Sequence, residues 1–172
     1  KFAAKLEHQF ELAAPANFIT PHGRHGVNWL DYENQPGCQI AHLFSYAGKP
    51  WRTQYWVRRI KDQVFGGATP TSGYNGDEDQ GQMGALSALM AIGLFDVQGG
   101  ASVEPRYEIT SPVFDRINIE LDPRYYAGRK FSIVVRNNSA ANIYIQRASL
   151  NGKPVEGRFW ITHRELTAGG TL

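Results

Sequence analysis

The spacing of apolar residues changes once along this chain, near residue 100, and that change limits the possible folds. Before it, apolar residues recur every three or four positions, the period of an amphipathic helix. After it, they alternate with polar residues at a period of two, typical of half-buried strands. The 172-residue chain is therefore expected to be α+β, with helices over 1–100 and a small antiparallel β region over 101–172.

Four segments carry the helical period. The periodic residues are Phe2, Leu6, Phe10 and Ala13 in the first, Ile40, Leu43 and Phe44 in the second, and Trp56, Ile60 and Val64 in the third. Pro50 suits the first turn of the third. The fourth, over 79–95, is apolar nearly all round and rich in Gly and Ala, which predicts a buried helix with close neighbours on several sides.

The strand period recurs three times. The alternating residues are Ile117, Ile119 and Leu121, then Phe131, Ile133 and Val135, then Ile143 and Ile145. Asn151-Gly152 indicates a type I′ hairpin. Because one apolar helix and three amphipathic ones cannot bury each other and also cover a sheet, we expect a fragment of a larger fold or an obligate assembler. The missing initiator Met fits a processed, nicked or truncated chain.

Composition excludes several classes of protein. The formal net charge is +2, with Lys and Arg scattered, so nucleic acid and anionic membranes are not indicated as partners. A single cysteine, Cys38, excludes an internal disulfide framework. No apolar run approaches the roughly 20 residues that span a bilayer.

A glycine-rich loop, GGATPTSGYNGDEDQGQ at 66–82, leads into the fourth helix with three consecutive acids at its end. If the loop is extended there, Asp77 and Asp79 project to one side and Glu78 to the other. The positive end of the helix dipole would keep both aspartates ionised. An ionised carboxylate can accept a proton from water, as a general base does.

Two other interpretations of these acids stay open. Asp is a favoured helix N-cap, so Asp77 or Asp79 could serve only that role. Oxygen ligands also suit calcium, although the spacing does not complete an EF-hand loop. Glu78 is plausible as one calcium ligand among several.

A second polar cluster, DYENQP at 31–36, precedes the second helix and offers further oxygen ligands. Asn34 and Gln35 are candidates for a metal site, or else polar groups at a helix start. Trp29 and Tyr74 are candidates for stacking on sugar rings, although most aromatic residues simply pack in a core.

The run GYNGDEDQGQMGA at 73–85 resembles the catalytic segment of family ninety-two glycoside hydrolases, which are exo-acting α-mannosidases. Matching stretches follow the same order along nearly the whole chain: NQP at 34–36, YAGKPWRTQ at 46–54, YEITSPVF at 107–114, NIYIQ at 142–146, LNG at 150–152 and WITH at 160–163. Many members have Asn-Glu-Pro where this chain has Asn34-Gln35-Pro36, which weakens residue 35 as an anionic ligand.

The resemblance implies a fold and a mechanism. Residues 1–100 would form the last helices of an (α/α)₆ barrel, and 101–172 a small antiparallel sheet or sandwich. Asp77 and Asp79 would hold and deprotonate water, with inversion at a terminal mannose, most often α-1,2-linked. Calcium would bind and distort that mannose, near Asn34, Gln35 and Glu78. The resemblance also implies a periplasmic or extracellular enzyme, including outer-membrane association, that degrades N-glycans.

An inverting mechanism also needs a carboxylic acid on the opposite face of the sugar. In the family that Glu comes from an earlier part of the barrel, and nothing in this chain matches its segment. We therefore expect half of an active site, active only with the remainder of the same polypeptide. The alternative is a non-catalytic carbohydrate-binding or interaction module on the same scaffold. A third interpretation treats all the acids as structural caps.

Overall fold

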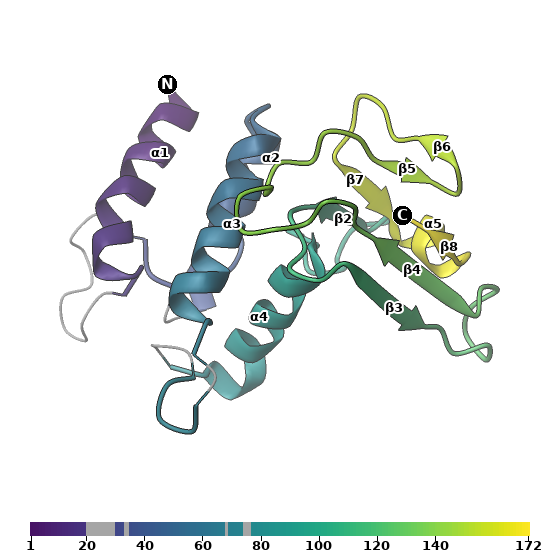
Figure 1. The fold of residues 1–172 in the computed structure, drawn as a ribbon, viewed down its shortest axis with the longest axis horizontal. Coiled ribbons are helices and arrows are strands. Elements are labelled where there is room, and N and C mark those ends of the chain that lie inside the picture. The colour runs from purple at the N-terminus through teal and green to yellow at the C-terminus, as the bar shows by residue number, and fades with distance from the viewer. Residues whose placement is uncertain (20–29, 33–34, 68, 74–76) are drawn as a thin grey trace.

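The computed structural model describes residues 1–19, 30–32, 35–67, 69–73 and 77–172. Figure 1 shows α1 to α4 on one side of the molecule and the strands on the other. The helices are α1 (Phe2–Ala13), α2 (Leu43–Tyr46), α3 (Pro50–Val64), α4 (Gln82–Ile92) and α5 (His163–Thr167). Short 3₁₀ turns lie at Ala14–Ala16, Gln35–Gly37, Ile40–His42 and Asp79–Gly81. In the part of the chain described, no helix is long and apolar enough to span a bilayer.

The strands form two three-stranded sheets and one hairpin. They are β1 (Leu94–Phe95), β2 (Arg106–Ile109), β3 (Arg116–Glu120), β4 (Lys130–Val134), β5 (Ser149–Leu150), β6 (Lys153–Pro154), β7 (Trp160–Thr162) and β8 (Gly170–Thr171). The sheet orders are β1-β2-β7 and β3-β4-β8, and β5-β6 is the hairpin. The architecture is thus mixed, with helices followed by small sheets.

The first and third predicted helices are confirmed. In α1 the side chains of Leu6, Phe10 and Ala13 are buried, and α3 begins at Pro50 and buries Trp56 among others. The rings of Phe10 and Trp56 lie 4.9 Å apart between centroids, joining α1 to α3. The periodic residues of both helices therefore meet in one core, except Phe2, which is exposed.

The fourth helix differs from its prediction at both ends. Its first turn is 3₁₀, with Asp79 and Gln80 at φ values of 51° and 59°, and α4 itself begins at Gln82. Gly93, at a φ of 80°, ends it, and Leu94–Phe95 forms a strand. The predicted burial on all sides is wrong for this chain, because Ala85 and Ala88 are exposed. This exposed face agrees with the expectation that the helices pack against further protein.

The sheet region shows two departures from a purely antiparallel arrangement of the predicted strands. The strands β4 and β8 pair in parallel, with Phe131 opposite Gly170. The predicted strand at 143–145 does not form. The amide of Ile145 instead donates a 2.9 Å hydrogen bond to the Gln54 side chain of α3, which occupies the donor that a strand partner would need. The predicted hairpin is confirmed, with Asn151 and Gly152 both at positive φ.

Two apolar clusters form the core. The larger joins the helices and includes Phe10, Trp56 and Met83. The smaller lies in the sheet region and includes Phe131 and Ile161. Since the clusters follow the two types of secondary structure, each region has a core of its own.

Arg58 of α3 connects the helices to the sheet region. Its side chain is buried, and Nη1 donates to the carbonyl oxygens of Ser111, at 3.2 Å, and Pro112. Its Nη2 donates to Asn138 Oδ1 at 3.0 Å and to the Ser139 carbonyl at 3.2 Å. One planar guanidinium therefore fixes two loops of the sheet region against α3.

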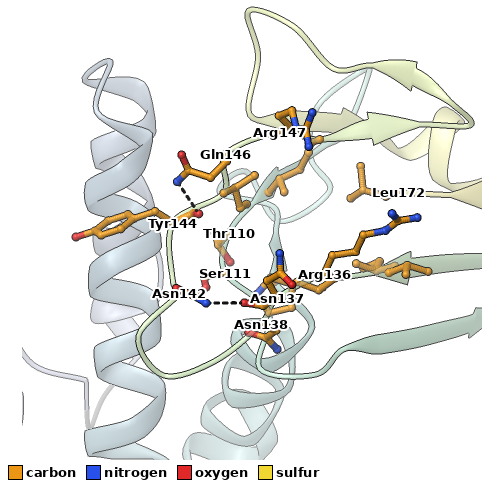
Figure 2. Close-up of a pocket in the computed structure, with 18 of the residues that line it drawn as sticks. Thr110, Ser111, Arg136, Asn137, Asn138, Asn142, Tyr144, Gln146, Arg147 and Leu172 are labelled. Carbon is orange, nitrogen blue, oxygen red and sulfur yellow. Dashed lines mark hydrogen bonds between the residues drawn. The ribbon is translucent and has the colours of Figure 1, made fainter.

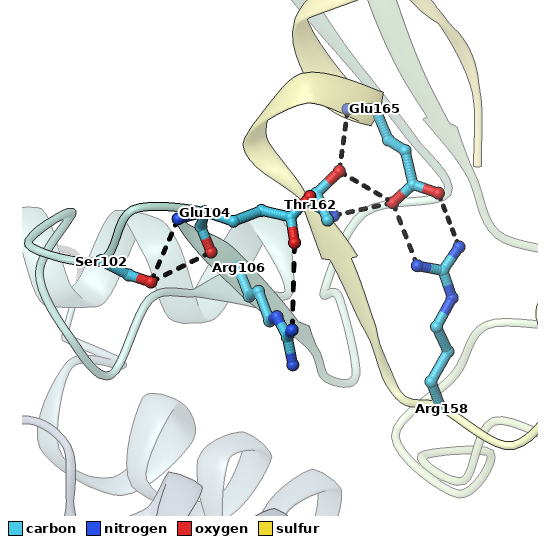
Figure 3. A network of polar contacts seen from close by, with 6 residues as sticks. All are labelled: Ser102, Glu104, Arg106, Arg158, Thr162 and Glu165. Atoms are coloured by element: carbon cyan, nitrogen blue, oxygen red, sulfur yellow. Dashed lines mark hydrogen bonds and ion pairs between the residues drawn. The ribbon is translucent and has the colours of Figure 1, made fainter.

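A second polar network orders the chain around α5 (Figure 3). Thr162 and Glu165 form a capping box, in which Thr162 Oγ1 accepts from the Glu165 amide at 3.1 Å. Arg158 pairs with Glu165 at 2.7 Å and lowers the pKa of that carboxyl to about 2. These contacts anchor the short helix beside β7.

Candidate active site

The three acids of the 66–82 loop have different surroundings. Asp77 is exposed, whereas Glu78 and Asp79 are half-buried. Because Asp79 has a left-handed backbone conformation, the chain is not extended there, and the condition behind the same-side prediction for Asp77 and Asp79 is not met. Non-glycine residues rarely adopt this conformation unless surrounding contacts hold them in it.

Glu78 provides those local contacts. It is the N-cap of the 3₁₀ turn, and its Oε2 accepts a hydrogen bond from the Gly81 amide. Its Oε1 accepts a second hydrogen bond, from the Gly84 amide at 3.2 Å. Two backbone donors at the start of the helix are thereby satisfied by one carboxylate. The observed capping residue is therefore Glu78, which leaves the Asp79 side chain to make a different contact.

Asp79 contacts the second polar cluster, 44 positions earlier in the chain. Its Oδ2 accepts a 2.9 Å hydrogen bond from the backbone amide of Gln35. Behind this contact, Gln82 Nε2 lies 3.5 Å from Cys38 Sγ, so the segment after Gln35 also packs against the start of α4. Burial raises the pKa of the Cys38 thiol, and the negative charge of Asp79 adds to that effect. Two segments that the sequence marked separately therefore meet at one place.

The oxygen atoms at this place suit a hard cation such as calcium. Gln35, Glu78 and Asp79 offer only oxygen ligands on their side chains, the type calcium prefers. Calcium takes six to eight ligands, so further oxygens would have to come from elsewhere. Among the described residues, no group of three or more His, Cys, Asp and Glu side chains is arranged to hold a metal. The chemistry of the site fits, although the described residues supply only part of a coordination shell.

Three candidates fall outside the part of the chain that the structure describes. These are Asn34, predicted near the metal, and Tyr74 and Trp29, predicted to contact the sugar. Their predicted roles stay predictions.

Glu108, on β2, is a titratable residue that the sequence analysis missed. It is only 5% exposed, and burial raises the pKa of its carboxyl to about 7, against hydrogen bonds from the Ser45 and Tyr46 side chains that lower it. Ser45 and Tyr46 belong to the helical region, so Glu108 lies where α2 meets the sheet. No periodic pattern at 107–109 marked it in the sequence. Its burial depends on contacts with Ser45 and Tyr46, which lie more than 60 positions earlier in the chain.

Comparison with known proteins assigns this chain to a family. The model of the glycosyl hydrolase family 92 catalytic domain matches residues 1–172. An uncharacterized secreted glycosidase from Arthroderma benhamiae is 32% identical over 152 residues, which are 86% of this chain and 18% of that protein. The chain therefore belongs to glycoside hydrolase family 92.

Solved structures agree with that assignment. A family 92 α-mannosidase from Bacteroides thetaiotaomicron, in complex with mannoimidazole, superposes with a TM-score of 0.75 and 25% identity, over 96% of this chain and 22% of that one. A family 92 inverting mannosidase from Bacteroides thetaiotaomicron VPI-5482 gives a TM-score of 0.69 and 30% identity, over 94% of this chain and 23% of that one. This chain thus spans about a fifth of the length of the relatives it matches.

Proposed function

We propose that the complete polypeptide containing this chain is a calcium-dependent, inverting α-mannosidase that removes terminal α-1,2-linked mannose from glycans such as N-glycans. The family match over residues 1–172 supports the hydrolase class. The main structural support for this active site is the hydrogen bond between the Gln35 amide and Asp79, because it joins the two segments predicted to surround the mannose.

In this proposal Asp79, with Asp77, acts as the general base. A water molecule held by this base attacks the anomeric carbon from the face opposite the leaving group. As its oxygen bonds to carbon, one proton passes to an aspartate, and the bond to the leaving oxygen breaks. The leaving oxygen takes a proton from a carboxylic acid in another part of the polypeptide. The bond from the Gln35 amide holds the Asp79 side chain in place.

Gln35, Asn34 and Glu78 are the proposed neighbours of calcium. A bound calcium ion supplies Lewis-acid attraction for the hydroxyl groups of the mannose. A carboxylate has more acceptor positions than the two that the Gly81 and Gly84 amides use, so capping by Glu78 does not by itself exclude metal contact. A secreted relative supports an extracellular or periplasmic location.

The direct experiment is hydrolysis of an aryl α-mannoside by the complete polypeptide, followed by proton NMR. The proposal expects β-mannose as the first product, since inversion converts the α anomer to β. If the α anomer forms first, the inverting mechanism is wrong. If saccharides bind without turnover, the polypeptide is a carbohydrate-binding module on the same scaffold.

A further inference from the structure

A large cleft opens in the sheet region, away from the loop that carries Asp77 and Asp79. Its volume is about 1230 Å³, and its walls are the segment after β2, the end of β4 and the segment 141–149 (Figure 2). Typical small-molecule pockets measure about 300–1,000 Å³. The cleft is thus large enough for a ligand of several linked rings.

The rim of the cleft carries neutral amides and guanidinium groups. Asn142 Nδ2 donates to the Asn137 carbonyl at 3.0 Å, and Gln146 Nε2 donates to the Tyr144 carbonyl at 3.1 Å. An amide side chain has two N–H donors and an acceptor oxygen, so these bonds leave it able to donate and accept. Among the described lining residues the only acid is Glu156. The N–H groups of these amides and guanidinium groups can donate to the hydroxyl oxygens of a sugar, and the amide oxygens can accept from its hydroxyl groups.

The floor of the cleft combines apolar side chains with buried hydroxyl residues. Ile133 and Val135 of the sheet-region core line it. Thr110 also lines the cleft; it is 1% exposed, and its Oγ1 has no hydrogen-bond partner among the described residues. A buried hydroxyl without a partner is costly. A ligand hydroxyl in the cleft would satisfy it, while the C–H faces of a sugar ring would cover the apolar floor.

The walls are held in place before any ligand binds. Arg58 fixes Asn138 and Ser139, and Gln54 fixes the Ile145 amide at 2.9 Å. Both side chains come from α3, so the 138–145 segment is held by the helical core. A preformed wall lowers the cost of binding.

We propose that this cleft binds an oligosaccharide through its hydroxyl groups, as a non-catalytic site. Thr110 bonds a buried sugar hydroxyl, and Asn142 and Gln146 bond hydroxyls at the rim. Binding at this site does not depend on hydrolysis at the proposed active site. Only the choice of mannan as the probe rests on the proposed function.

The test is affinity electrophoresis of the complete polypeptide in native gels containing soluble α-mannan. Asn142→Ala combined with Gln146→Ala is expected to weaken mannan binding about tenfold or more, the effect of losing one or two hydrogen bonds. Thr110→Val, which keeps the shape of the side chain but removes the hydroxyl, is expected to weaken binding by a similar factor. Gln98→Ala is the control, since Gln98 is exposed outside the cleft.

Melting temperatures separate binding from folding. If Thr110→Val raises the melting temperature and mannan binding is unchanged in every variant, another part of the polypeptide fills the cleft and the proposal is overturned. Asp79→Asn should lose turnover of an aryl α-mannoside yet retain cleft binding. Retained turnover in Asp79→Asn would contradict the proposed function alone, and loss of mannan binding only in the cleft variants would still support this site.

Discussion

The backbone amide of Gln35 donates a 2.9 Å hydrogen bond to Oδ2 of Asp79. This bond connects the segment before α2 with the loop before α4. Because a main-chain donor has little freedom, it fixes the position of the carboxylate more firmly than a flexible side chain would. The proposed base is therefore held by the fold on one side and by the Glu78 cap on the other.

Asp79→Asn tests the base while conserving this contact. An amide oxygen can still accept from Gln35, so we expect the melting temperature to stay nearly unchanged. Turnover should fall by about 10²–10⁴-fold, since an amide cannot take the proton from water. Asp62→Asn, at an exposed position on α3, is the matched control and should leave turnover unchanged.

Calcium removal tests the proposed metal. Dialysis of the complete polypeptide against a chelator is expected to abolish α-mannoside turnover, and added calcium to restore it. Gln35→Ala should raise the calcium concentration needed for half-maximal recovery by about tenfold, the effect of weakening one ligand position. Full turnover after thorough chelation would remove calcium from the mechanism.

The helices were predictable because their apolar periods are long and local. The period identified α1 and α3, whereas the start of α4 was misplaced because the Glu78 side chain holds the preceding turn in a left-handed conformation. The strand predicted at 143–145 fails for a similar reason, since Gln54 takes the amide of Ile145. In each case a side-chain contact overrides the local pattern.

The three acids of the 66–82 loop could be identified from the sequence as candidate site residues. Which of them caps the helix and which makes a long-range contact could not. Nothing in the spacing shows that Glu78 caps the helix and that Asp79 contacts a residue 44 positions away. The burial of Glu108 was equally hidden, because Ser45 and Tyr46, the residues of α2 that contact it, are distant in the sequence. Long-range packing decides such features.

Glu108 predicts an unusual pH dependence of stability. Its pKa is about 7 in the folded protein and about 4.5 when unfolded, so the folded state binds the proton more tightly. The contribution of Glu108 to the free energy of unfolding is therefore greatest below pH 4.5 and is lost as the pH rises through about 7. Glu108→Gln should remove this loss and stabilise the protein at pH 8, measured by thermal or urea unfolding. The full change in pKa corresponds to ~3 kcal/mol, and solvent screening of a partly accessible carboxyl reduces the expected gain to about 2 kcal/mol.

Glu104→Gln is the control for that comparison, because Glu104 is exposed and the ion pair of its carboxylate with Arg106 spans 4.0 Å. His42, whose pKa burial lowers to about 3, adds an opposite pH slope, but it is present in both variants and cancels. Equal pH profiles for the two variants would show that the Glu108 carboxyl is not perturbed.

Replacing Arg58 is expected to destabilise the fold even when the new side chain keeps the positive charge. Arg58→Met leaves three carbonyl oxygens and the Asn138 amide without their donor and should cost about 3 kcal/mol. Arg58→Lys should cost nearly as much, since an ammonium group lacks the planar fork. Arg59→Met, which loses bonds to Gln63 and Tyr55 on its own helix, should cost about 1 kcal/mol or less. A fully stable Arg58→Lys variant would refute the geometric role.

Turnover of the Asp79→Ala variant with and without azide tests the central claim most directly. Azide is a nucleophile that needs no deprotonation, so it can replace the water that the missing base no longer activates. We expect turnover of an activated α-mannoside to fall by about 10²–10⁴-fold without azide. With azide, β-mannosyl azide should form, because attack still comes from the face opposite the leaving group. Two results would contradict a general-base role for Asp79. One is turnover by Asp79→Ala without azide that stays within about twofold of the unaltered protein, and the other is the absence of β-mannosyl azide when azide is added.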